Sequence, residues 1–167
     1  MEIIVGYDFK KNGYTLNELR KEFRETFEDI YDTEEQIVKD DPSHLIVMVE
    51  DELILGWAIW HESNTREHSK GDPRDDEDIK ILEALANGRN EIIELHELWL
   101  KKAHRGKGYG EQFFAFFEKF VISKGYDKIV YYANNESAIK LCRKRGYKEK
   151  YYESLKWYTF FKAVHIQ

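Results

Sequence analysis

The segment Arg105-Gly106-Lys107-Gly108-Tyr109-Gly110 has the composition of a phosphate-binding turn. It lies between an apolar, strand-like stretch and a helix-like stretch rich in phenylalanine. Glycines at alternate positions let several backbone N–H groups point at one anion, and the start of a helix adds partial positive charge. The segment therefore predicts a diphosphate site, with an ordinary strand-to-helix turn as the alternative.

Two common phosphate motifs do not match this turn. A P-loop requires a Gly-Lys pair followed by Ser or Thr, which this segment lacks. A dinucleotide-binding fold requires Gly-x-Gly-x-x-Gly near the start of the first strand–helix–strand unit. Here the spacing is Gly-x-Gly-x-Gly and the turn follows a predicted hairpin.

The composition favours a small, soluble, single-domain protein. The 167 residues are 42% hydrophobic and 15% aromatic, which predicts one well-packed domain over residues 1–167. The net charge of −6 disfavours a nucleic acid partner and favours a cationic substrate. Cys142 is the single cysteine, and no Cys/His cluster has zinc-ligand spacing, so no metal is expected.

We expect a cytoplasmic protein that does not enter a membrane. It is expected to be either a monomer or a homodimer. The N-terminal residues do not have the pattern of a signal peptide. The longest apolar run, residues 53–60, is too short to cross a bilayer.

Periodicity in the first half predicts a strand over residues 2–7 and a helix from a Thr15–Glu18 capping box to Tyr31. A second helix is expected over 33–40, and strands over 45–49 and 53–60 form a hairpin. Residues 61–71 read as a loop. A helical insertion over 72–88, started by Asp72-Pro73, precedes the next strand.

The second half alternates strands and helices. Strands are expected over residues 92–101, 128–133, 147–151 and 155–163, with helices from 108 to about 125 and from 134 to 146. The first of these helices places Phe113, Phe116, Phe117, Phe120 and Val121 on one face. The fold class is α/β (α+β): a mixed sheet of about seven strands with helices on both faces.

Two motifs together resemble the GNAT N-acetyltransferase superfamily. The turn from Arg105 to Gly110 matches its Arg/Gln-x-x-Gly-x-Gly/Ala signature, and residues 94–100 resemble the strand that precedes it. About thirty residues later, the segment from Asn135 to Tyr147 resembles the second signature, Asn-x-x-Ala-x-x-x-Tyr-x-x-x-Gly-Phe. The two motifs cover residues 94–147 in the expected order.

This resemblance implies acetyl-CoA as the co-substrate and assigns its binding residues. Backbone groups of Leu98, Trp99 and Leu100 would pair with the pantetheine arm. Arg105 would lie at the entrance of the turn, and the side chain of Asn135 would approach the pantetheine or acetyl end. The pyrophosphate would be held by backbone N–H groups of Gly106, Lys107, Gly108, Tyr109, Gly110 and Glu111.

The catalytic expectations rest on the same strand and the second motif. An ammonium substrate must lose a proton before it attacks the thioester, which requires a base. Glu94 resembles a glutamate base of some family members, and His96 is an alternative base or water anchor. Cys142 occupies the place of the family's usual acidic tyrosine, and it is either an acid or a small core residue.

Three functions are compatible with these residues. The first is an N-acetyltransferase that acts on a small cationic amine by direct attack in a ternary complex. The second is a protein or peptide acetyltransferase that modifies a lysine or an N-terminus. The third is a non-catalytic acyl-CoA-binding module. This possibility is suggested by the absence of the family's usual tyrosine at position 142.

Overall fold

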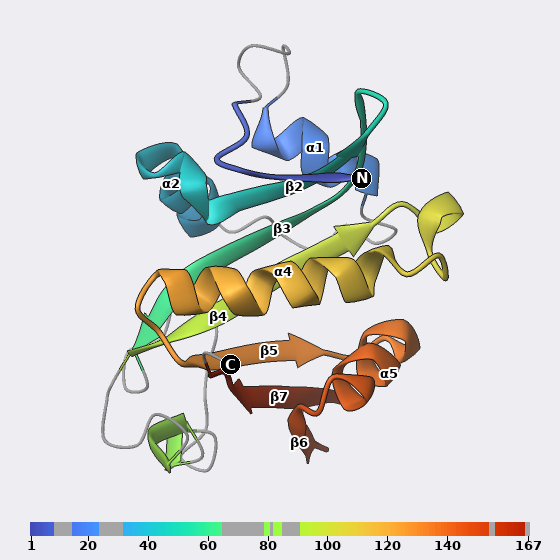
Figure 1. The fold of residues 1–167 in the computed structure, drawn as a ribbon. Coiled ribbons are helices and arrows are strands. Elements are labelled where there is room, and N and C mark those ends of the chain that lie inside the picture. Colours follow the sequence, from blue (N-terminus) through green and yellow to red (C-terminus); the bar gives the residue numbers. More distant parts are fainter. Residues whose placement is uncertain are drawn as a thin grey trace. The chain divides into compact units, whose positions relative to one another are not determined.

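The computed structural model describes residues 1–8, 15–23, 32–64, 79–80, 82–84, 91–153 and 156–165 (Figure 1). The chain divides into two compact units. The first unit comprises Met1–His61 and Glu97–Tyr109, and the second comprises Glu62–His96 and Gly110–Gln167. The expected single domain over residues 1–167 stays a prediction.

Seven strands form one mixed sheet in the order β1-β2-β3-β4-β5-β7-β6. β1–β2, β2–β3, β5–β7 and β6–β7 are antiparallel, whereas β4 and β5 are parallel. The strands are β1 (Glu2–Val5), β2 (Leu45–Glu50), β3 (Leu53–Asn64), β4 (Glu91–Leu100), β5 (Lys128–Ala133), β6 (Lys148–Tyr152) and β7 (Trp157–Ala163). The expected mixed α/β sheet is therefore confirmed.

The helices begin and end close to the expected positions. The helices described from end to end are α1 (Leu16–Phe23), α2 (Asp32–Asp40), α4 (Tyr109–Ser123) and α5 (Glu136–Lys144), with short 3-10 helices η2 (Pro42–His44) and η3 (Lys102–His104). The capping box is present, since Thr15 N–H donates to Glu18 Oε2 at 2.7 Å and Glu18 N–H donates to Thr15 Oγ1 at 3.2 Å. The expected continuation of α1 to Tyr31 lies outside the described residues.

The core of the first unit forms where α1 packs on β2 and β3. Apolar side chains at helical spacing on α1 meet side chains that alternate along the strands, so both periodicities point into one core. The buried members are Leu16, Leu19, Phe23, Val38, Leu45, Val47, Trp57 and Ile59.

Strand β3 is longer than the sequence indicates. Residues 61–64 were expected in a loop, because they are polar, but they continue the strand. The burial pattern explains this: His61 and Ser63 are buried while Glu62 between them is exposed. The alternation of a strand therefore persists with polar side chains on its inner face.

The second unit is built around α4, which carries five of the chain's phenylalanines. Its buried face consists of Phe113, Phe114, Phe117 and Val121, so Phe114 is buried where the spacing favoured Phe116 and Phe120. The Phe114 ring contacts Tyr131 of β5, with ring centroids 5.9 Å apart. In Figure 1, β5 and β7 lie side by side, as their antiparallel register requires.

Only part of the expected 72–88 helical insertion is described. Residues 79–80 and 82–84 are helical, and Leu82 packs with Ile92 and Val130 in a small core of the second unit. The other residues of the insertion lie outside the described part of the chain. None of the helices among the described residues combines the length and hydropathy needed to cross a lipid bilayer.

Candidate functional site

The turn from Arg105 to Gly110, called the glycine loop below, connects η3 to α4. Gly106 and Gly108 have φ values of +76° and +84°, a region that side chains other than glycine seldom adopt. A Cβ at either position would meet no atom within 4 Å. These two glycines are therefore required by the backbone conformation and not by lack of space.

The third glycine of the loop is required for a different reason. A Cβ on Gly110 would lie 2.9 Å from Cδ2 of Leu141, so this glycine allows the start of α4 to approach α5 closely. α4 begins at Tyr109, and its first N–H groups lack partners within the helix. The glycine loop thus ends on the positive end of a 15-residue helix.

Strand β4 leads into this loop and is tied to it at Leu100. The Arg105 side chain turns back, and its Nε donates to the Leu100 carbonyl at 3.1 Å. Lys101 N–H donates to the Leu55 carbonyl of β3 at 2.8 Å. Leu98, Trp99 and Leu100 are half-buried, and the Trp99 side chain packs against the core of the first unit.

Gly56 of β3 is a structural requirement that the sequence did not reveal. A Cβ there would lie 2.5 Å from the Trp99 carbonyl oxygen and 2.6 Å from Cε of Met48. The backbone of the predicted pantetheine segment therefore occupies the space that a side chain at position 56 would need. An isolated glycine in a strand often marks such a close approach, which is the signal that could have identified it.

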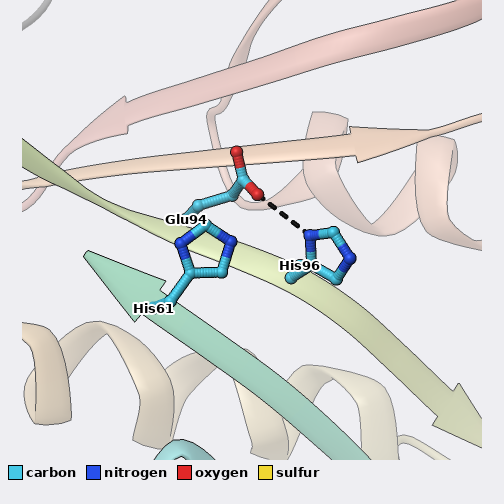
Figure 2. Close-up of side chains that lie close together, drawn as sticks. All are labelled: His61, Glu94 and His96. Atoms are coloured by element: carbon cyan, nitrogen blue, oxygen red, sulfur yellow. Dashed lines mark hydrogen bonds and ion pairs between the residues drawn. The ribbon is translucent and has the colours of Figure 1, made fainter. Parts of the chain in front are cut away.

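The two candidate bases, Glu94 and His96, form a pair on β4 (Figure 2). His96 Nδ1 lies 3.0 Å from Glu94 Oε2. The Glu94 side chain is fully buried, whereas the His96 side chain is 22% exposed. The equal parity expected for the two residues along the strand is consistent with this contact. Figure 2 also labels His61, which is buried on β3.

Asn135 caps helix α5. Its side-chain oxygen accepts a hydrogen bond from Ala138 N–H at 2.8 Å, and its backbone is extended, as an N-cap requires. Glu111, the last residue of the predicted pyrophosphate set, pairs with Lys144 at 2.7 Å. A hydrogen bond from Lys144 lowers the pKa of the Glu111 carboxyl.

Cys142 lies inside the second unit and is fully buried. Burial, aided by the charges of Glu118 and Glu149, raises the pKa of its thiol to about 12. This burial supports the second of the two interpretations given above, a small core residue, and the role of Cys142 stays a prediction.

The family of the chain follows from comparison of its sequence with family models. The model described as the acetyltransferase (GNAT) family matches residues 13–147. The chain belongs to the GNAT family. It is therefore an acyltransferase, and the GNAT family uses acetyl-CoA as acyl donor. No curated protein sequence matches the chain.

Solved structures show the same GNAT fold at low sequence identity. An agmatine N-acetyltransferase mutant in its apo form has a TM-score of 0.68 at 11% identity, with 98% of this chain and 100% of that chain covered. A polyamine N-acetyltransferase of Drosophila melanogaster has a TM-score of 0.65 at 10% identity, with the same coverage of 98% and 100%. The NatC complex bound to Gag peptide and CoA has a TM-score of 0.63 at 13% identity and full coverage of both chains.

Proposed function

We propose that this GNAT protein transfers the acetyl group of acetyl-CoA to a small cationic amine, by direct attack in a ternary complex. The observation that carries the proposal is the Glu94–His96 pair on β4, which joins a fully buried carboxylate to a partly exposed imidazole. Because the Glu94 side chain has no exposed surface, we assign it the role of holding and charge-stabilising the histidine, which exchanges protons with the substrate.

In this proposal His96 is the base and Glu94 is its partner. With Glu94 ionised, His96 Nδ1–H donates to Oε2, and Nε2 is proposed to accept a proton from the substrate ammonium. The freed amine attacks the thioester carbon, and the C–S bond breaks as the amide forms. The second nitrogen proton passes to the departing thiolate sulfur, which gives free CoA.

The donor half of the proposal rests on the glycine loop. Backbone N–H groups from Gly106 to Glu111 are proposed to hold the pyrophosphate, and Leu98, Trp99 and Leu100 the pantetheine arm, with Arg105 at the loop entrance. The positive φ values of Gly106 and Gly108 support this, because such turns expose consecutive N–H groups to one anion. Asn135 is proposed to contribute mainly as the cap that orders α5. Cys142 is proposed to take no part in proton transfer, since its thiol is buried.

The choice of a small amine is supported by two observations. The chain has a net charge of −6, which attracts a cationic substrate. Two of the similar structures are named for agmatine and polyamine acetylation. A peptide or protein N-terminus is the second candidate acceptor, because the NatC complex, bound to a peptide, has a comparable TM-score of 0.63.

The test is release of CoA thiol from acetyl-CoA in the presence of a panel of acceptors. The panel contains agmatine, polyamines, arylalkylamines, and peptides with free N-termini or lysines. Turnover on small amines supports the proposal, whereas turnover on peptides alone establishes the second candidate. CoA binding with no turnover on any acceptor would instead indicate the non-catalytic acyl-CoA-binding module.

A further inference from the structure

Tyr109, the first residue of α4, is hydrogen-bonded to a residue far away in the sequence. Its hydroxyl donates to Glu50 Oε2 at 3.0 Å, across a separation of 59 residues. Glu50 is the last residue of β2, and both side chains are part-buried. The amino group of Met1 lies 3.4 Å from the other oxygen of the same carboxylate.

The protonation states make this a charge-assisted hydrogen bond. The hydrogen bond from Tyr109 is the largest cause of a lowered pKa for the Glu50 carboxyl. The same bond raises the pKa of the Tyr109 hydroxyl. Near neutral pH the donor therefore keeps its proton and the acceptor keeps its charge, an arrangement about twice as strong as a neutral pair.

Because Tyr109 lies inside the glycine loop, its hydrogen bond to Glu50 restricts the conformation of the loop. Tyr109 lies between two glycines, Gly108 and Gly110, and Gly108 has a φ of +84°. Glycines widen the range of backbone conformations, so a loop with three of them loses much entropy when it must adopt one. A side-chain anchor inside the loop reduces this cost before the ligand arrives.

We propose that Glu50 is a positioning residue for the donor: by holding the Tyr109 hydroxyl it keeps the glycine loop in the conformation that binds the diphosphate of acetyl-CoA. This inference rests on the proposed function, because it requires the loop to be the pyrophosphate site. Glu50 itself does not touch the coenzyme in this proposal. Its effect is transmitted through Tyr109.

The experiment compares two acyl donors, acetyl-CoA and S-acetylpantetheine, the second of which lacks the diphosphate and nucleotide. Tyr109→Phe and Glu50→Ala each remove the bond, and we expect the KM for acetyl-CoA to rise about tenfold with little change in kcat, as loss of one charge-assisted bond predicts. Glu50→Gln keeps an acceptor oxygen and should raise KM about threefold. The kcat/KM for S-acetylpantetheine should stay at the wild-type value in Glu50→Ala and Glu50→Gln.

The control is Glu52→Gln, which removes the same charge from the exposed turn after β2. It should leave both donors unaffected. The KM of the double variant Glu50→Ala/Tyr109→Phe for acetyl-CoA should be no higher than that of either single variant, because both substitutions remove the same bond.

Calorimetric measurement of CoA binding distinguishes failure of the proposed function from failure of the anchor alone. A wild-type protein that binds no CoA would refute the proposed function. If the wild type binds CoA, three results would refute the anchor alone. The variants could have the wild-type KM for acetyl-CoA, they could lose activity equally with both donors, or Glu50→Gln could bind CoA more tightly than the wild type.

Discussion

His96 Nδ1 lies 3.0 Å from Oε2 of Glu94, two residues earlier on the same strand, and the two side chains differ sharply in exposure. This relationship changes the roles that the two residues can take. Glu94 has no exposed surface and His96 is partly exposed, which is why we propose Glu94 as the residue that orients the imidazole and His96 as the residue that exchanges protons.

The first prediction concerns the pH dependence of this pair. In the wild type, kcat should fall at low pH because a protonated imidazole cannot accept the substrate's proton. His96→Gln should lower kcat about 100-fold and abolish this acid limb, since general base catalysis typically contributes 100-fold or more. The measurement is the profile of kcat against pH at saturating acetyl-CoA. An acid limb that survives in His96→Gln would exclude His96 as the base.

Glu94→Gln distinguishes positioning from direct base catalysis. The amide keeps the size of the side chain but removes its charge, so we expect a loss of about tenfold in kcat with the KM for acetyl-CoA unchanged. If Glu94→Gln abolished activity while His96→Gln remained active, the roles of the two residues would have to be exchanged.

The second prediction concerns the glycine loop. Gly108→Ala places a Cβ at a φ of +84°, which costs about 1 kcal/mol or more, and the loop should relax to a different conformation. We expect CoA affinity to fall at least tenfold, as measured by calorimetry. Gly125→Ala is the matched control, because Gly125 has a φ of +86° with open space around it but lies after α4. This control should lower stability and preserve affinity, and an equal loss of affinity in both would remove the loop's special role.

The third prediction concerns Cys142. A thiol that is fully buried, with a pKa of about 12, should react with a disulfide reagent at pH 8 only after unfolding in guanidinium. Cys142→Ala should cost about 1 kcal/mol in unfolding free energy and leave kcat and its pH profile unchanged. A fall in kcat in a variant that stays folded would restore Cys142 as the acid.

The fourth prediction concerns a charge network in the second unit. Glu118 accepts hydrogen bonds from Arg145 Nη2 at 2.6 Å and from Lys162 Nζ at 2.9 Å. Burial raises the pKa of the Glu118 carboxyl, but the two cationic partners outweigh it, and the net pKa lies below the ordinary 4.5. Glu118→Gln should therefore lower the unfolding free energy at pH 7 by about 1–3 kcal/mol, because two half-buried cations lose their counter-charge.

The pH dependence of this loss follows from the sign of the shift. A lowered pKa in the folded state stabilises the fold above the ordinary pKa and ceases to do so as the pH falls through the folded value. The difference between wild type and Glu118→Gln should thus be constant above pH 5 and shrink below about pH 4.5. Glu136→Gln, which removes the exposed pair with Lys140, is the control and should lower the melting temperature much less than Glu118→Gln does. A difference that grew on acidification would contradict the network.

Local sequence patterns determined the family and most of the elements. The glycine loop, the Thr15–Glu18 capping box and the Asn135 cap each act over a few residues, so their spacing in the sequence is also their spacing in space. The same holds for β5, whose expected bounds, 128–133, are those observed. The parity of Glu94 and His96 could likewise be read from the period of a strand.

Tertiary structure decided what depends on burial and on contacts between distant residues. The polar residues 61–64 continue strand β3, with His61 and Ser63 buried. On α4, Phe114 is buried in preference to Phe116. Gly56 is needed because the Trp99 carbonyl approaches it, and Glu50 reaches Tyr109 across 59 residues. No periodicity encodes such pairs, since they arise only when separate elements pack. The sequence by itself therefore determined the GNAT family of the chain. Packing decided that Glu94 is buried beside His96 and that Glu50 contacts Tyr109 of the glycine loop, because these contacts form only in the folded chain.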